Sequence, residues 1–163
     1  MSAFTFPLWP EMLYFAYGSN MSRSLMAARC PQARAVGPAA LDGFAFIVTA
    51  DGYASVVPRP SAVVPGVLWR IGPRDLAALN AYEGVAQGLY RIRVLPVRCG
   101  RSLRSALVYV GRSAVPGRPR PGYMTMVLAA AREWGLAERH IEGLARWSPR
   151  WRGVRAAETG ELA

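Results

Sequence analysis

The stretch Met12-Leu-Tyr-Phe-Ala-Tyr-Gly-Ser-Asn20 carries the strongest structural signal in the chain. It is apolar and aromatic up to Tyr17 and then stops abruptly at a Gly-Ser-Asn sequence. This pattern predicts a buried strand that ends in a tight loop. Residues 22–29 then favour a short helix, with Asn20 or Ser22 as its N-cap and Pro31 just beyond its end. Consecutive backbone amides at the start of such a helix can hold an anion or an oxyanion.

The remaining segments predict strands that cluster in the middle of the chain. Asp42-Gly43 is expected to form a hairpin turn between two short strands, and the Pro-rich stretch 58–60 to join two more. This pattern favours an α+β fold, with a small mixed or antiparallel sheet that can close as a β-barrel flanked by helices. The expected strands are 33–41, 44–49, 53–57, 63–71, 90–97 and 103–110, and the later helices are expected to begin at 72–75, at 123 and at 137.

The length of 163 residues fits one domain, expected over 1–149, followed by a loose tail over 150–163 that has no apolar period. The sequence contains no run of about 18 apolar residues, so no membrane span is expected. The N-terminal residues lack the basic and apolar regions of a signal peptide, so a cytoplasmic location is expected.

Cys30 and Cys99 are expected to be reduced thiols. With His140 as their only further partner, they fall short of the four or so ligands of a structural zinc site. We therefore expect no metal and no cofactor.

The net charge of +10 arises from 20 basic residues against 10 acidic ones, and all the basic residues are arginine. A complete lack of lysine, together with abundant Ala, Gly and Pro, is typical of GC-rich codon usage, which weakens the charge as a sign of nucleic-acid binding. That alternative stays open, because one predicted hairpin is rich in arginine and tryptophans could stack on bases. The residues concerned are Arg91, Arg93, Arg98, Arg101, Arg104, Trp134, Trp147 and Trp151.

The options for catalysis narrow by elimination. The sole histidine, His140, lies among charged residues and is expected on the solvated face of a late helix. No GxSxG, Walker, GxGxxG or HExxH motif is present, which disfavours a hydrolase built on a Ser–His or Cys–His pair. Glu83 differs from the other acidic residues because only apolar residues, aromatic residues and glycines surround it. Such a carboxylate tends to have a raised pKa suited to proton transfer, although a cap or an ion pair with an arginine explains it equally well.

Taken in order, several spaced motifs resemble those of the gamma-glutamylcyclotransferase family, in the AIG2-like superfamily. The resemblance extends over about residues 12–149. The motifs are Tyr-Phe-Ala-Tyr-Gly-Ser-Asn-Met at 14–21, Pro-Gly-Val-Leu-Trp at 65–69, Leu-Asn-Ala-Tyr-Glu-Gly-Val at 79–85, Gly-Leu-Tyr at 88–90, Leu-Val-Tyr-Val at 107–110 and Pro-Gly-Tyr at 121–123.

The resemblance implies a β-barrel flanked by helices, with one pocket. It implies that Glu83 is the general acid/base and that a small gamma-glutamyl substrate cyclises to 5-oxoproline and a free amine or amino acid. The family's glutathione-specific branch usually has leucine in place of Asn20, which argues against that branch. A monomer or homodimer is expected, and a non-catalytic ligand-binding protein on the same fold is the remaining alternative. The implied substrate-binding residues are Tyr17, Gly18, Ser19, Asn20, Tyr90 and Tyr123, with Tyr109 as a further candidate.

Overall fold

The first predicted strand, β1 (Met12–Ala16), is part of a closed barrel and pairs with β3 and β5. In the computed structural model, which describes residues 12–149, the strand order is β1-β3-β2-β4-β5. Neighbouring strands are antiparallel, except that a short parallel contact of Tyr14 with Leu107 joins β1 to β5 and closes the ring. The predicted mixed or antiparallel barrel is therefore confirmed. The other strands are β2 (Arg34–Val48), β3 (Ala54–Ile71), β4 (Tyr90–Cys99) and β5 (Ser102–Gly111).

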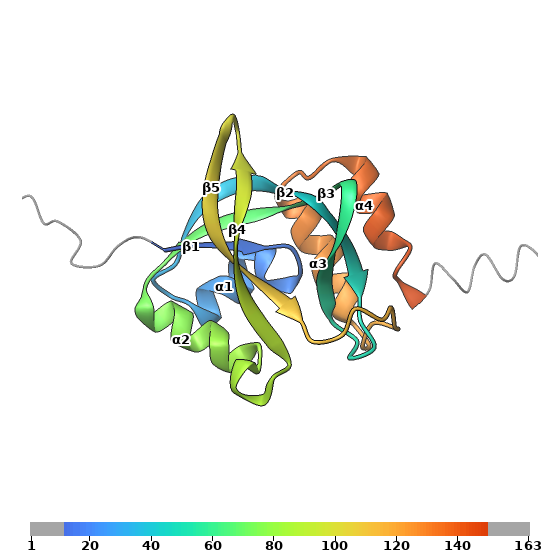
Figure 1. Cartoon of the computed structure of the whole chain (residues 1–163), viewed down its shortest axis with the longest axis horizontal. Helices are drawn as coiled ribbons and strands as arrows, with labels where there is room; N and C mark the ends of the chain where they lie inside the picture. The colour runs from blue at the N-terminus through green and yellow to red at the C-terminus, as the bar shows by residue number, and fades with distance from the viewer. Residues whose placement is uncertain (1–11, 150–163) are drawn as a thin grey trace, which may run out of the picture.

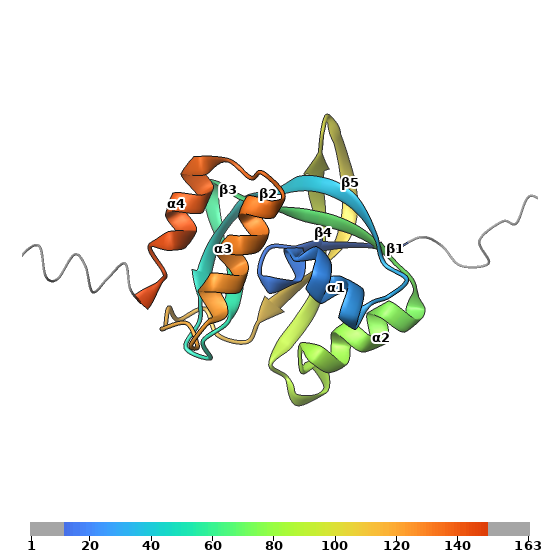
Figure 2. The ribbon, with the colours of Figure 1, turned by 180° about the vertical axis from the view of Figure 1, so that it is seen from behind.

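Four helices flank the barrel in two groups (Figures 1 and 2). One pair, α1 (Arg23–Arg29) and α2 (Pro73–Tyr82), lies toward one end of the barrel, and the other pair, α3 (Tyr123–Glu133) and α4 (Glu138–Ala145), lies toward the other end. Ser22 is the N-cap of α1, because its hydroxyl accepts a hydrogen bond from the Leu25 amide at 3.3 Å. The arrangement confirms the predicted α+β fold. None of the described helices is long and apolar enough to cross a membrane.

Two predicted chain breaks are wrong. β2 continues through Asp42-Gly43, and its register with β3 shifts there. Gly43 adopts a φ of 80°, so the left-handed conformation that a hairpin turn would use produces a bulge within the strand. The Pro-rich stretch is likewise part of β3: Pro58 pairs with Phe44 and Val63 with Asp42, which leaves the residues between them bulged outward. Two long, bent strands replace four predicted short ones.

The side chain of His140 also differs from the prediction. It is half-buried rather than solvated, and its Nε2 atom has no hydrogen-bond partner among residues 12–149. Burial lowers the pKa of His140 to about 4, so the imidazole is neutral at physiological pH.

The cysteines and tryptophans are mostly as expected. Cys30 and Cys99 are free thiols. Trp134 packs edge-on against Trp69, and Trp147 packs against Phe46, so both are partly buried against the core. Trp151 lies outside the described residues, as do 1–11 and the tail 150–163, so the predicted domain limits stay a prediction.

Gly66 allows β3 to approach β1 closely. A Cβ atom there would lie 2.3 Å from the Ala16 carbonyl oxygen and 2.7 Å from Cζ of Phe15. We expect Gly66→Ala to lower the free energy of unfolding by about 1–3 kcal/mol, measured by urea denaturation, because the two strands must separate. Gly143→Ala in α4 is the matched control: outside its own helix, no atom of residues 12–149 lies within 4 Å of the added carbon, so it should stabilise by about 0.5–1 kcal/mol. Equal effects of the two substitutions would contradict this account.

Candidate active site

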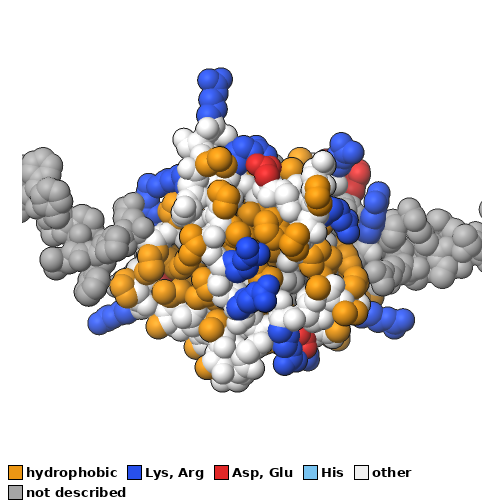
Figure 3. Space-filling view, in the orientation of Figure 1, with side chains coloured by type: hydrophobic (Ala, Val, Ile, Leu, Met, Phe, Trp, Pro, Cys, Tyr) orange, Lys and Arg blue, Asp and Glu red, His pale blue; other side chains and the backbone are white. Residues whose placement is uncertain are grey.

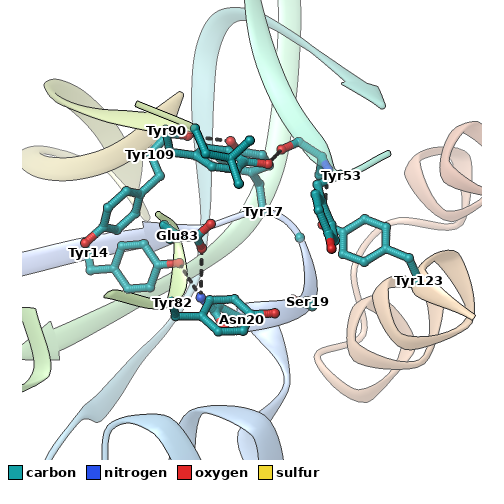
Figure 4. A pocket seen from close by; sticks show the side chains of 13 residues that line it. Tyr14, Tyr17, Ser19, Asn20, Tyr53, Tyr82, Glu83, Tyr90, Tyr109 and Tyr123 are labelled. Atoms are coloured by element: carbon teal, nitrogen blue, oxygen red, sulfur yellow. Dashed lines mark hydrogen bonds between the residues drawn. The ribbon is translucent and has the colours of Figure 1, made fainter. Parts of the chain in front are cut away.

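A pocket of about 140 Å³ opens beside the loop that follows β1. All seven tyrosines of the chain line it, on five different elements and the loops between them (Figure 4). It also brings together every residue that the sequence singled out for the site, whereas His140, Cys30 and Cys99 are not among its lining residues. The lining residues are Tyr14, Tyr17, Gly18, Ser19, Asn20, Tyr53, Ala54, Tyr82, Glu83, Leu89, Tyr90, Tyr109 and Tyr123.

Glu83 lies at the end of α2, and its carboxylate points between two groups of tyrosine rings (Figure 4). Its backbone amide donates to the Leu79 carbonyl at 2.8 Å, and Gly84, with a φ of 62°, ends the helix directly after it. Burial raises the pKa of Glu83 to about 7, although the positive charge of Arg29 acts in the opposite direction. Near neutral pH the acid and the carboxylate are therefore both populated, as a group that accepts and donates protons requires.

Of the two alternative explanations of Glu83, the cap is borne out in position, since Glu83 is the C-cap residue of α2 and its backbone amide makes the capping contact. The ion pair is not: the Glu83 side chain pairs with none of the arginines of the described residues. Its carboxylate Oε1 instead accepts a hydrogen bond from Asn20 Nδ2 at 3.3 Å. The same Nδ2 atom donates to the Tyr14 hydroxyl at 3.1 Å, and Asn20 is only 3% exposed. Asn20 therefore supports Glu83 and does not cap α1, a role that Ser22 takes.

The loop after β1 is held from both sides. Trp134, at the end of α3, donates its indole N–H to the Met21 carbonyl at 2.6 Å. A side chain at Gly18 would place a Cβ atom 2.8 Å from the Tyr123 hydroxyl. Any larger residue at position 18 would therefore displace this hydroxyl from the loop backbone.

Hydrogen bonds divide five of the seven tyrosine hydroxyls into two kinds. Three of them donate their protons to the protein: Tyr17 to the Tyr109 carbonyl at 2.5 Å, Tyr90 to the Ala54 carbonyl at 2.5 Å, and Tyr109 to Asn80 Oδ1 at 2.7 Å. These three hydroxyls can offer a ligand only lone pairs and ring faces.

Tyr14 and Tyr123 are different, because their oxygens accept hydrogen bonds. Tyr14 accepts from Asn20, and Tyr123 accepts from the Ala54 amide at 3.2 Å. Neither hydroxyl donates to an acceptor among residues 12–149. Burial raises the pKa of both phenols, so both keep a proton that they can donate to a bound ligand.

Sequence reasoning did not assign to the site the lining residues Tyr14, Tyr53, Ala54, Tyr82 and Leu89, nor Arg29 beside them. Tyr14 had a usable signal, since its side chain points to the opposite face of β1 from its core neighbours Leu13 and Phe15. Arg29, one of 20 basic residues, had none. Among residues 12–149, no three His, Cys, Asp or Glu side chains gather as a metal site requires.

The arginines proposed for nucleic-acid binding do not share one surface. Arg91 and Arg93 lie on one face of the β4–β5 hairpin, and Arg98, an odd number of positions further along β4, lies on the other. Arg98 also forms an ion pair with Asp42 at 2.9 Å. Figure 3 shows basic side chains spread over the visible face rather than gathered along one groove. Trp134 and Trp147, packed against other aromatic rings, are not presented for base stacking.

Comparison with known proteins places the chain in a family. It matches the family model described as "Gamma-glutamyl cyclotransferase, AIG2-like" over residues 14–130. The gamma-glutamylcyclotransferase of Mus musculus is 30% identical over 84% of this chain and 79% of its own, and that of Homo sapiens is 30% identical over 85% and 80%. A solved structure named "Gamma-glutamyl cyclotransferase" has a TM-score of 0.79 at 26% identity, covering 86% of this chain and 89% of the other. YkqA from Bacillus subtilis has a TM-score of 0.73 at 26% identity, covering 85% of this chain and 54% of the other. The chain therefore belongs to the gamma-glutamylcyclotransferase family, an enzyme family, as its spaced motifs predicted.

Proposed function

We propose that the pocket releases 5-oxoproline from a small gamma-glutamyl amide, with Glu83 as the general acid/base. The observation that carries this proposal is a single carboxylate with a pKa of about 7 in a pocket otherwise lined by neutral groups. We further propose that the protein acts in the cytoplasm as a monomer or homodimer, without a metal or cofactor.

The substrate itself supplies the nucleophile. In a gamma-glutamyl amide the alpha-amine reaches the gamma-carbonyl carbon by closing a five-membered ring. Ring closure of well-oriented groups can reach effective molarities of about 10⁵ M or more, so the enzyme needs no nucleophile of its own. Its tasks are to orient the amine, to stabilise the oxyanion and to move protons.

Glu83 moves the protons in this scheme. As a carboxylate it takes a proton from the substrate ammonium, and the freed amine attacks the carbonyl carbon. Glu83 then donates that proton to the leaving nitrogen as the scissile C–N bond breaks. The new ring nitrogen loses a second proton, which ends on the released amine, so charge balances between substrate and products. Such acid–base catalysis contributes about 10²–10⁴-fold.

The loop after β1, which begins with Tyr17, binds the gamma-glutamyl group in this scheme together with Tyr90 and Tyr123. The amides of Gly18 and Ser19, next to the uncommitted Tyr123 proton, are suited to the oxyanion or the alpha-carboxylate. Tyr17 and Tyr90, whose protons are already donated to the backbone, are suited to accept from the substrate's N–H groups. Asn20 contributes its backbone, because its side chain holds Glu83 and Tyr14.

The direct test is a panel of gamma-glutamyl compounds that differ in the leaving amine, with 5-oxoproline release measured by mass spectrometry. Release from at least one of them, without added metal, is expected. Release of glutamate in place of 5-oxoproline, or no turnover of any member, would reject the proposed reaction. The preferred member of the panel identifies the amine.

The pH dependence follows from Glu83. Since burial raises its pKa to about 7, its base form is lost as the pH falls below 7. We expect kcat/KM to fall about ten-fold per pH unit on the acid side of that value. An acid limb near pH 4.5, the ordinary value for glutamate, would show that another group is titrated.

A further inference from the structure

Arg29, the last residue of α1, does not line the pocket, but it contacts two residues that lie next to Glu83, Asn20 and Tyr82. Its guanidinium donates a hydrogen bond to Asn20 Oδ1, and Asn20 in turn donates to Glu83. The Arg29 Cζ atom also lies 3.6 Å from the centroid of the Tyr82 ring, the residue directly before Glu83.

The first contact fixes the orientation of the Asn20 side chain. The two ends of an amide have nearly the same shape, but one accepts and the other donates. Because a guanidinium only donates, it selects the Oδ1 end, which leaves Nδ2 to face Glu83 Oε1 and Tyr14. A flipped Asn20 would set Oδ1 against the carboxylate and leave Glu83 without this donor.

The second contact joins two helices. Tyr82 is 46% exposed, and one face of its ring is stacked on the guanidinium of Arg29. The stack ties the end of α1 to the end of α2, from which Glu83 projects. Loss of the guanidinium therefore releases Glu83 on two sides.

The charges around Glu83 give Arg29 a third effect. The phenols that interact with Glu83 lie on β1 and the loop after it, on β4, on β5 and on α3. Burial raises the pKa of each, so they are neutral at physiological pH. Arg29, on α1, is the charged group among the described residues whose field opposes the burial of the Glu83 carboxylate. The phenols are those of Tyr14, Tyr17, Tyr90, Tyr109 and Tyr123.

We propose that Arg29 is a positioning residue that acts from outside the pocket: by orienting Asn20, stacking on Tyr82 and adding one positive charge, it keeps Glu83 placed and ionisable. This inference rests on the proposed function where activity is concerned. Its effect on Glu83 can also be measured directly, without turnover.

The test compares Arg29→Gln and Arg29→Lys with a matched control, Arg23→Gln. Arg23 is at the other end of α1, stacks on Trp134 at 3.7 Å and pairs with Glu133 at 3.3 Å, so its replacement removes the same kinds of contact without touching Glu83, Asn20 or a residue that lines the pocket. The Glu83 carboxyl is titrated by ¹³C NMR in glutamate-labelled protein and assigned by the loss of its signal in Glu83→Gln. The pH profile of 5-oxoproline release is recorded for each variant.

We expect Arg29→Gln to raise the Glu83 titration midpoint by about one pH unit and to move the acid limb of kcat/KM by the same amount. At pH 7 this lowers kcat/KM about five-fold through the smaller base fraction, and higher pH recovers that part of the loss. Arg29→Lys keeps the charge but not the planar fork, so its midpoint stays near the wild-type value while kcat falls. Arg23→Gln should change neither measurement.

Arg29→Gln with a wild-type Glu83 midpoint and wild-type kcat/KM overturns the inference. If that variant does not fold, Arg29→Lys decides, and wild-type kcat in it overturns the positioning role. A shifted midpoint in Arg29→Gln, with no 5-oxoproline released even by the wild type, leaves the link between Arg29 and Glu83 standing and rejects the proposed function. The two failures are thus distinguishable.

Discussion

Glu83→Gln is expected to lower kcat for 5-oxoproline release by at least about 10²-fold, with a melting temperature no lower than that of the wild type. Glutamine keeps the shape of the side chain and the oxygen that accepts from Asn20 Nδ2. It removes the proton that must travel from the substrate ammonium to the leaving nitrogen. The loss therefore falls on the chemical step, and KM should change little.

The expected stability follows from the sign of the pKa shift. Burial raises the pKa of Glu83 from 4.5 to about 7, so the folded state binds this proton more tightly than the unfolded state. Ionisation of Glu83 thus destabilises the folded protein progressively as the pH rises from 4.5 through 7. Glutamine carries no charge at any pH, and at pH 8 the variant should melt at the same temperature as the wild type or a higher one.

Glu142→Gln, on the exposed surface of α4, is the control for this substitution and should leave both kcat and melting temperature unchanged. Near-normal turnover in Glu83→Gln would reject Glu83 as the acid/base. A much lower melting temperature would instead mean that Glu83 supports the fold, as the cap or ion pair considered from the sequence would do.

The parts of the fold that the sequence predicted correctly were those determined by a short stretch of residues, such as an apolar run followed by turn-forming residues. The apolar run of β1 and the Gly-Ser-Asn sequence after it predicted a buried strand and a loop, and both are present. Asp42-Gly43 misled because a glycine at positive φ serves a hairpin turn and a strand bulge equally well. What decides between the turn and the bulge is that β2 pairs with β3 on both sides of Gly43. That pairing is not visible in a local stretch of sequence.

The same distinction holds for the site. Glu83 was identifiable because a carboxylate among apolar residues and glycines is unusual along the chain. Arg29 was not identifiable, since its role depends on how two helices far apart in sequence meet at Tyr82 and Asn20. Composition gave the number of tyrosines but not that the barrel gathers all seven around one carboxylate. Residues whose function comes from tertiary contact alone leave no local pattern.

The substrate's own amine provides the sharpest test of the reaction type. Acetylating the alpha-amine of a turned-over gamma-glutamyl compound removes the nucleophile and leaves the scissile amide intact. We expect mass spectrometry to show 5-oxoproline from the free amine and no cleavage of the acetylated compound. A conventional amidase, which attacks with water or a side chain, would cleave both.

Two further measurements make a negative result with the acetylated compound informative. The alpha-carboxylate and the gamma-carbonyl are unchanged by acetylation, so the compound should still bind at the loop after β1 and inhibit competitively. The N-methyl analogue adds bulk but keeps a nucleophilic amine, so it should still cyclise, more slowly, to N-methyl-5-oxoproline. Together they separate the loss of the nucleophile from a failure to fit the pocket. Cleavage of the acetylated compound, or release of glutamate from the free amine, would instead assign Glu83 the activation of a water molecule, because a shared fold does not fix the reaction.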